Sequence, residues 1–134
     1  QFAGLKHLSR LEQVMARSEW SDSTISEGVM LDTRDRVIEG TMSNIFLVEK
    51  QQLLSPDLTD CGVDGIQRQK IIDIAKILKI RQQTEIIPLH RLLCADEVFI
   101  CNSVIGIWPV RSVDTQGYQL GPITGKLMNS LKKL

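Results

Sequence analysis

The run CGVDGIQRQKIIDIAKILKI constrains the fold more than any other part of the sequence. Two glycines, Gly62 and Gly65, bracket a short turn, and a helix is predicted to begin near Gly65. The apolar residues of its predicted inner face are Ile66, Ile71, Ile74, Ala75 and Leu78. A long amphipathic helix between stretches that lack this spacing predicts a fold that mixes α and β structure.

Short segments rich in β-branched and aromatic residues lie on both sides of this helix. The expected strands are 27–32, 37–41, 44–50, 53–56, 84–89, 97–102, the part of 103–113 after Gly106, and 117–120. Further helices are expected at 10–20, 90–95 and 121–134. The early strands follow one another as a meander and no βαβ series repeats, so the sequence predicts the α+β class with mostly antiparallel strands.

Length and charge exclude several classes of protein. The chain has 134 residues, which fits one domain, and its sixteen basic residues balance sixteen acidic ones. The sequence has no basic patch that would favour binding to nucleic acid. It also has no apolar run of about 20 residues, the length that a membrane span needs. Cys61, Cys94 and Cys101 form no CxxC pair, which favours a reducing compartment and hence the cytoplasm. His7 and His90 are too far apart for a zinc site, so no metal is expected.

Two charged residues have apolar or small neighbours. Lys6 follows Ala3, Gly4 and Leu5, a setting that can lower the pKa of a lysine and make it an amine nucleophile. Glu39 lies in VIEGTMSN, and it is either a solvent-facing strand residue or the partner of a buried cation. Taken singly, each residue has an ordinary structural interpretation, Lys6 as a solvated surface lysine.

Two turns could bind an anion. GVDGIQRQ exposes free backbone N–H groups at the positive end of a helix dipole, which suits a phosphate, although a glycine-capped helix start without a ligand is common. CNSVIG, after a buried strand, could add the Ser103 hydroxyl and the next amides, or it is a plain tight turn. An amine, a carboxylate and two such turns are the set that a pyridoxal phosphate enzyme needs.

GLKHLSRLEQV, VIEGTMSNIFLV, CGVDGIQRQ and CNSVIGIWPV resemble, in order and spacing, the carboxy-terminal domain of fold-type IV pyridoxal phosphate enzymes. This superfamily holds the branched-chain and D-amino acid aminotransferases and the aminodeoxychorismate lyases, and the sequence is most similar to the lyase family. The resemblance implies a pseudo-barrel of mostly antiparallel strands surrounded by helices. It also implies that 1–134 is one cofactor-binding domain whose smaller amino-terminal partner domain is missing, as the start at Gln1 suggests.

Carried over by position, the resemblance gives each candidate residue a role. Lys6 would form the Schiff base with the cofactor and act as the catalytic base, and Glu39 would pair with the pyridine nitrogen. Main-chain amides of Gly65 and Ile66 would bind the phosphate. The turn at Ser103 and Val104 would bind it as well, with Asn102 as a weaker candidate that shapes the turn.

The implied activity is conversion of 4-amino-4-deoxychorismate to 4-aminobenzoate and pyruvate in folate biosynthesis, by a cytoplasmic enzyme that is a homodimer in its full-length form. Without the amino-terminal domain, little or no turnover is expected from this chain. Two alternatives stay open: an aminotransferase of the same fold, and a non-catalytic fragment that retains it. His7, Arg10 and Arg68 lie near the predicted site, and structural or solvent-exposed roles are favoured for them.

Overall fold

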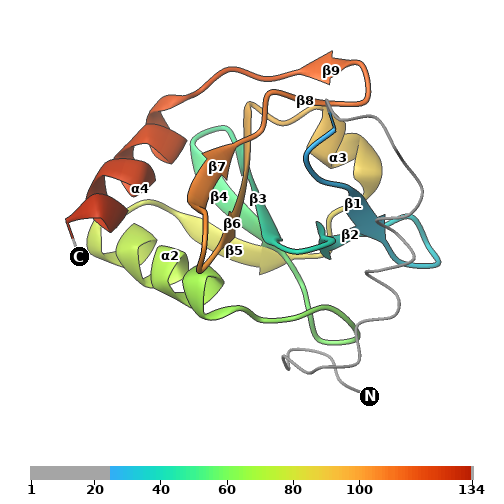
Figure 1. Ribbon diagram of the computed structural model, residues 1–134, viewed down its shortest axis with the longest axis horizontal. Helices are drawn as coiled ribbons and strands as arrows, with labels where there is room; N and C mark the ends of the chain where they lie inside the picture. The colour runs from blue at the N-terminus through green and yellow to red at the C-terminus, as the bar shows by residue number, and fades with distance from the viewer. Residues whose placement is uncertain (1–24, 134) are drawn as a thin grey trace.

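The structure is a computed structural model and describes residues 25–133 (Figure 1). Helix 10–20 and Lys6, both predicted from the sequence, lie outside the described residues. The elements in chain order are β1 (Val29–Leu31), β2 (Val37–Gly40), β3 (Asn44–Glu49), β4 (Gln52–Pro56), α2 (Ile66–Ile77), β5 (Gln82–Glu85), α3 (Leu89–Leu93), β6 (Glu97–Asn102), β7 (Gly106–Pro109), β8 (Ser112–Val113), β9 (Gln116–Gly117) and α4 (Pro122–Lys132).

A mixed five-stranded sheet with the order β5-β4-β3-β6-β7 forms the centre of the molecule. Strand β3 pairs antiparallel with β4 and β6, and β6 pairs antiparallel with β7. Strands β4 and β5 are parallel, because α2 carries the chain back across the sheet between them. The predicted fold class, α+β with mostly antiparallel strands, is therefore confirmed, with one crossover that the meander pattern did not indicate.

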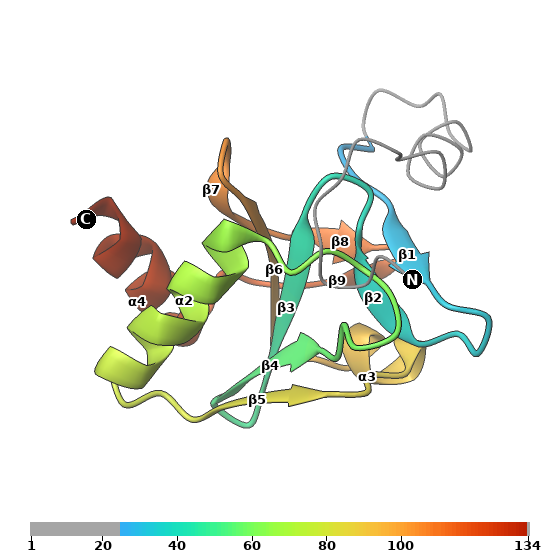
Figure 2. The same cartoon turned by 90° about the horizontal axis from the view of Figure 1, so that it is seen from below.

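Both faces of the sheet are covered, as two views of the ribbon show (Figures 1 and 2). Side chains of β3 alternate between the faces: Phe46 packs in the cluster beneath α2 and α4, and Leu47 packs in the cluster with β2 and α3. The Phe46 ring stacks on Phe99 of β6, with ring centroids 5.0 Å apart. Because both faces are buried, strands β3 and β6 read as almost continuous apolar runs.

Two predicted strands are displaced. Strand β5 is polar and ends at Glu85, whereas the sequence placed a strand at 84–89 on the apolar Ile86 and Ile87. At the sheet edge, β5 is held by backbone pairing with β4 and needs no apolar side chains. The strand predicted at 117–120 is also wrong, since β9 ends at Gly117.

Burial distinguishes the three cysteines, which are all free thiols. Cys101 is completely buried in β6, and this burial raises the pKa of its thiol to about 12.

Within residues 25–133, no helix has both the length and the apolar composition needed to cross a membrane.

Candidate functional site

A cavity of about 100 Å³ lies where the β2–β3 loop, the start of α2 and the end of β6 meet. Its lining residues are Glu39, Met42, Ser43, Asn44, Val63, Gly65, Ile66, Gln67, Asn102 and Ser103. Five of the seven residues predicted as site residues are in this lining. Of the other two, Val104 follows Ser103 but does not line the cavity, and Lys6 is outside the described residues.

Glu39 is a buried carboxylate at the edge of this cavity, with only 3% of its surface exposed. It belongs to β2, whose four residues are all buried, so the solvent-facing interpretation of Glu39 is wrong. Its Oε2 accepts a hydrogen bond from the backbone N–H of Val63 at 3.1 Å. A buried carboxylate needs such donors, because desolvating a charge without them is costly.

The turn before α2 is fixed by Asn44, a residue that the sequence analysis did not single out. Its Nδ2 donates to the Val63 carbonyl oxygen at 2.7 Å, and its Oδ1 accepts from the Gly65 N–H at 3.2 Å. A Cβ on Gly65 would lie 2.6 Å from this Oδ1, so a larger residue at this position would displace the Asn44 side chain. The Gly65 amide, predicted as a phosphate donor, therefore donates to Asn44 here.

The start of α2 presents donors to the cavity. Gly65 is the N-cap and makes no side-chain capping hydrogen bond. The amides of the first helical residues, Ile66, Gln67 and Arg68, have no acceptor within the helix. The Ile66 side chain is 73% exposed, which corrects its predicted place on the buried face, and Leu78 at the other end is also exposed.

Arg68 points away from this opening and braces the turn. Its Nη1 forms an ion pair with Asp64 at 2.7 Å, and its Nη2 donates to the Ser55 hydroxyl at 2.8 Å. The side chain is buried, which agrees with a structural role. His7 and Arg10 lie outside the described residues.

Asn102 shapes the second turn. Its Oδ1 accepts hydrogen bonds from the amides of Val104 at 2.8 Å and Ile105 at 2.9 Å. Its Nδ2 donates to the Met42 carbonyl oxygen at 2.9 Å, which ties this turn to the β2–β3 loop. The Val104 amide is thus occupied by Asn102, whereas the exposed Ser103 side chain borders the cavity.

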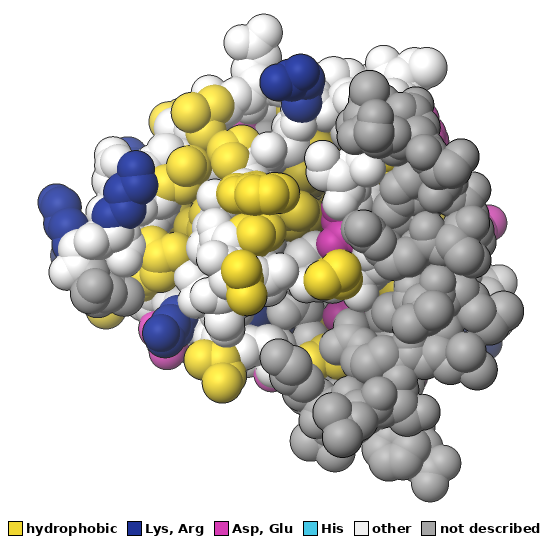
Figure 3. All heavy atoms as spheres, in the orientation of Figure 1, with side chains coloured by type: hydrophobic (Ala, Val, Ile, Leu, Met, Phe, Trp, Pro, Cys, Tyr) yellow, Lys and Arg dark blue, Asp and Glu magenta, His cyan; other side chains and the backbone are white. Residues whose placement is uncertain are grey.

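Exposed apolar side chains surround the opening. Met42 and Ile66 line the cavity, and Val104 and Trp108 follow on the β6–β7 turn and β7. Figure 3 shows hydrophobic side chains exposed over β7 and near the start of α2. Several exposed apolar side chains on one face are typical of a surface that contacts another molecule or domain.

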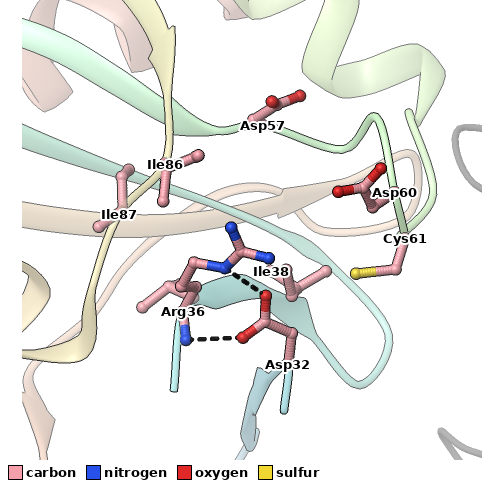
Figure 4. Close-up of a pocket in the computed structure, with 9 residues that line it drawn as sticks. Asp32, Arg36, Ile38, Asp57, Asp60, Cys61, Ile86 and Ile87 are labelled. Carbon is pink, nitrogen blue, oxygen red and sulfur yellow. Dashed lines mark hydrogen bonds and ion pairs between the residues drawn. The ribbon is translucent and has the colours of Figure 1, made fainter. Parts of the chain in front are cut away.

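A second, smaller cavity of about 30 Å³ contains none of the predicted site residues (Figure 4). Here Arg36 Nε pairs with Asp32 Oδ2 at 2.6 Å, and the Arg36 amide donates to Asp32 Oδ1 at 3.0 Å, which closes the β1–β2 turn. Burial, followed by the charges of Asp32 and Asp60, raises the pKa of the nearby Cys61 thiol. Among the described residues, no cluster of His, Cys, Asp and Glu could hold a metal ion.

The donor set of the larger cavity fits a cofactor with a phosphate and a basic ring nitrogen. A helix N-terminus with free amides binds a phosphate, and a buried carboxylate holds a protonated nitrogen. The central sheet is mixed, with α2 and α4 on one face and β1, β2 and α3 on the other, and the phosphate and nitrogen ligands described above lie at one end of it. This arrangement defines a pyridoxal phosphate enzyme domain of fold-type IV.

The chain belongs to the family described as amino-transferase class IV, whose model matches residues 1–113. Aminodeoxychorismate lyase of Vibrio harveyi is 34% identical over 133 residues, which cover 96% of this chain and 49% of the relative. A probable branched-chain-amino-acid aminotransferase of Thermotoga maritima is 33% identical over 131 residues, covering 96% of this chain and 47% of the relative.

The solved structure of 4-amino-4-deoxychorismate lyase from Pseudomonas aeruginosa superimposes with a TM-score of 0.95 at 46% sequence identity. The match covers 98% of this chain and 49% of that one. The chain thus spans about half the length of the relatives it matches. Enzymes of this family depend on pyridoxal phosphate, so the cofactor predicted from the sequence is confirmed at the level of the family.

Proposed function

We propose that the protein is a pyridoxal phosphate-dependent lyase that converts 4-amino-4-deoxychorismate to 4-aminobenzoate and pyruvate. The observation that carries this proposal is the 46% identity to the Pseudomonas aeruginosa lyase in a match that covers 98% of the chain. In this role it would serve folate biosynthesis as a cytoplasmic homodimer.

Each predicted site residue within residues 25–133 has a task in this proposal. The Ile66 amide, with those that follow it at the start of α2, and the Ser103 hydroxyl would bind the phosphate. Glu39, whose Oε2 accepts a hydrogen bond from the Val63 amide, would hold the proton on the pyridine nitrogen. Gly65, Asn102 and Val104 would shape the two turns, since they form hydrogen bonds with other residues of the protein.

Lys6 is the proposed catalytic residue. Pyridoxal phosphate, when bound, supplies an electron sink for the negative charge that develops on the carbon bearing the substrate nitrogen. The Lys6 amine would remove the proton from that carbon and then supply a proton as the enolpyruvyl group leaves as pyruvate. Aromatisation of the remaining ring makes the step favourable.

The rest of the proposal concerns chain length. Because the relatives are about twice as long, we infer that a smaller amino-terminal domain completes the enzyme. The exposed apolar side chains around the cavity support such a covering domain. Residues 1–134 alone would then turn over poorly, and an activity within a few fold of that of the complete protein would contradict this.

The first test is the absorbance spectrum of the complete protein mixed with pyridoxal phosphate. The wild-type protein should show a long-wavelength band of cofactor bound covalently to lysine, and Lys6→Ala should abolish it. Lys70→Ala is the matched control, because Lys70 is an exposed lysine of α2 near the cavity and should leave the band unchanged. A band that survives Lys6→Ala would refute the assigned role of Lys6.

A second candidate function is amino transfer, which the identity to the Thermotoga maritima aminotransferase supports. Pyruvate release from aminodeoxychorismate indicates the lyase, and amino transfer to 2-oxoglutarate indicates the aminotransferase. Neither product from a protein that binds the cofactor would favour the third alternative, a non-catalytic domain that retains the fold.

A further inference from the structure

The Glu27 carboxylate accepts five hydrogen bonds from other residues in the described part of the chain, yet Glu27 does not line the cavity. It lies just before β1 and is half-buried. Three backbone amides donate to its carboxylate: Gly28 at 2.9 Å, Thr41 at 3.0 Å and Met42 at 3.1 Å. The hydroxyls of Thr41 and Ser43 donate to it as well, the latter at 2.9 Å.

Four of these five hydrogen bonds come from residues 41–43, the loop that joins β2 to β3. The loop connects Glu39 in β2 to Asn44, the residue that fixes the turn before α2. Two of its members, Met42 and Ser43, line the cavity themselves. The position of the loop therefore determines one wall of the cavity.

The loop is also held from its other side. While the Met42 amide donates to Glu27, the Met42 carbonyl oxygen accepts from Asn102 Nδ2 at 2.9 Å. Asn102 in turn fixes the turn that carries Ser103. A continuous series of hydrogen bonds thus runs from Glu27 through the loop to the second predicted phosphate turn.

Gly40, just before the loop, packs closely against both Ser43 and Glu27. A Cβ on Gly40 would overlap the Ser43 hydroxyl and approach the Glu27 side chain to 3.0 Å. Burial raises the pKa of the Glu27 carboxyl, but the hydrogen bonds from Thr41, Gly28, Met42 and Ser43 outweigh it and lower the pKa overall. The group is therefore ionised at neutral pH, as an acceptor for five donors must be.

We propose that Glu27 is a positioning residue for the cofactor: its carboxylate fixes loop 41–43, so that the cavity wall is already formed when pyridoxal phosphate binds. This inference rests on the proposed function, since it assumes that the cavity binds the cofactor. A carboxylate is needed because every donor in the group is an N–H or O–H.

Glu27→Gln tests this requirement with almost no change of shape. The hydroxyls of Thr41 and Ser43 can rotate to accept from the new amide group, but backbone N–H groups cannot. Whichever way the glutamine side chain is turned, at least one of the loop amides or the Gly28 amide faces an NH₂ group and loses its acceptor. The loop should then lose order while its sequence stays intact.

The matched control is Glu97→Gln. Glu97 is also a buried carboxylate that accepts hydrogen bonds from two backbone amides, but it is the first residue of β6, contacts the start of α4 and does not line the cavity. Both variants should lower the melting temperature. Only Glu27→Gln should raise the dissociation constant for pyridoxal phosphate, about ten-fold, with Glu97→Gln within about two-fold of wild type.

Three measurements on the complete protein decide the inference: thermal unfolding, absorbance titration with pyridoxal phosphate, and hydrogen exchange of the Thr41 and Met42 amides without cofactor. Glu27→Gln should speed exchange at these amides and weaken binding. Normal cofactor affinity in Glu27→Gln, with a fall in melting temperature like that of Glu97→Gln, would overturn it and leave Glu27 a merely structural residue.

Two further outcomes separate this inference from the proposed function. Absence of the Lys6-dependent absorbance band from the wild-type protein itself would defeat the proposed function, and the inference with it. If Glu27→Gln does not fold, Thr41→Val replaces it: it removes one hydroxyl donor with little change of volume and should weaken cofactor binding about three-fold. Unchanged affinity in Thr41→Val together with unchanged amide exchange would overturn the inference.

Discussion

The two long helices begin alike in sequence and differently in structure. Both α2 and α4 have a glycine N-cap in extended conformation, and neither N-cap makes a side-chain hydrogen bond. At α4, Pro122 occupies the first position and has no N–H, and the amides of Ile123 and Thr124 donate to the carboxylate of Glu97. At α2, the corresponding positions are Ile66, Gln67 and Arg68, whose amides have no such carboxylate partner among the described residues.

The difference indicates which helix start can bind an anion. Glu97 neutralises the positive end of the α4 dipole and fills the space beside Gly121, so an incoming phosphate would meet a like charge there. The start of α2 faces a cavity, and within residues 25–133 the amides of its first turn have no such carboxylate acceptor. The first-turn amides of α4 thus have a carboxylate of the protein as their acceptor. We propose that the cofactor phosphate is the acceptor for the first-turn amides of α2.

The largest expected effect comes from giving α2 the carboxylate that α4 has. Ile66→Glu should raise the dissociation constant for pyridoxal phosphate about 100-fold, or about 2.7 kcal/mol, by repulsion of the phosphate. An acidic residue in the first turn should leave stability unchanged or slightly higher. Absorbance titration and thermal unfolding measure the two effects.

Ile77→Glu is the control for this substitution, because Ile77 is equally exposed at the other end of the same helix. It should leave cofactor affinity unchanged. An affinity of Ile66→Glu within about three-fold of wild type would mean that the phosphate does not bind at α2.

The converse change removes the carboxylate from α4. Glu97→Ala leaves two amides at a buried helix start without an acceptor, which should lower the free energy of unfolding by about 2 kcal/mol. Denaturant unfolding of the complete protein measures this loss. Since Glu97 does not line the cavity, a changed cofactor dissociation constant in a still-folded variant would contradict the separation of the two helix starts.

The sequence indicated both helix starts because glycine, proline and the helical repeat are local signals. Extending the apolar face of α2 to Ile66 and Leu78 was wrong, since helical spacing does not reveal where the packed surface ends. Asn44 and Glu27 were missed for a different reason. Apart from Gly28, their hydrogen-bond partners are 14 to 21 residues away in the chain, so neither residue has a local pattern that marks it.

The site residues likewise divide into those that a local sequence pattern marks and those that it does not. The roles of Lys6 and Glu39 came from resemblance to a family, because a lone lysine or glutamate in a sequence has no distinguishing chemistry. The structure places Glu39 in a buried strand beside the cavity, whereas the role of Lys6 remains a prediction. The mixed character of the sheet was not predicted because β5, a polar edge strand, depends on pairing with a distant segment.

A paired glycine substitution sharpens the comparison with smaller effects. Gly65 and Gly121 have φ angles of −69° and −101°, which alanine adopts readily, so only the new Cβ contacts matter. At Gly121 the Cβ would overlap the Glu97 carboxylate, and Gly121→Ala should cost about 2 kcal/mol of stability with normal cofactor affinity. At Gly65 the Cβ displaces Asn44, and Gly65→Ala should weaken cofactor binding about ten-fold.

Gly125→Ala serves as the control for both variants. Gly125 lies inside α4, and nothing lies within 4 Å of an added Cβ, so alanine there should stabilise the protein by about 0.5–1 kcal/mol. If Gly65→Ala and Gly121→Ala changed both stability and cofactor affinity by similar amounts, the two helix starts would have the same role. That result would contradict the proposed difference between them.

Removal of the cofactor should produce the smallest effect and the most local one. In the α4 start, the Ile123 and Thr124 amides have a protein acceptor, so their hydrogen exchange should be equally slow with and without pyridoxal phosphate. The Ile66 and Gln67 amides at the α2 start should be protected only when the phosphate is bound, because only then do they have an acceptor. Exchange measured by NMR on both forms of the complete protein tests this, and the Gln69 amide, which donates to the Gly65 carbonyl oxygen, is the internal control with similar protection in both. If the α2 amides were already as well protected as those of α4 without cofactor, the protein itself would complete both helix starts, and the phosphate would have to bind elsewhere.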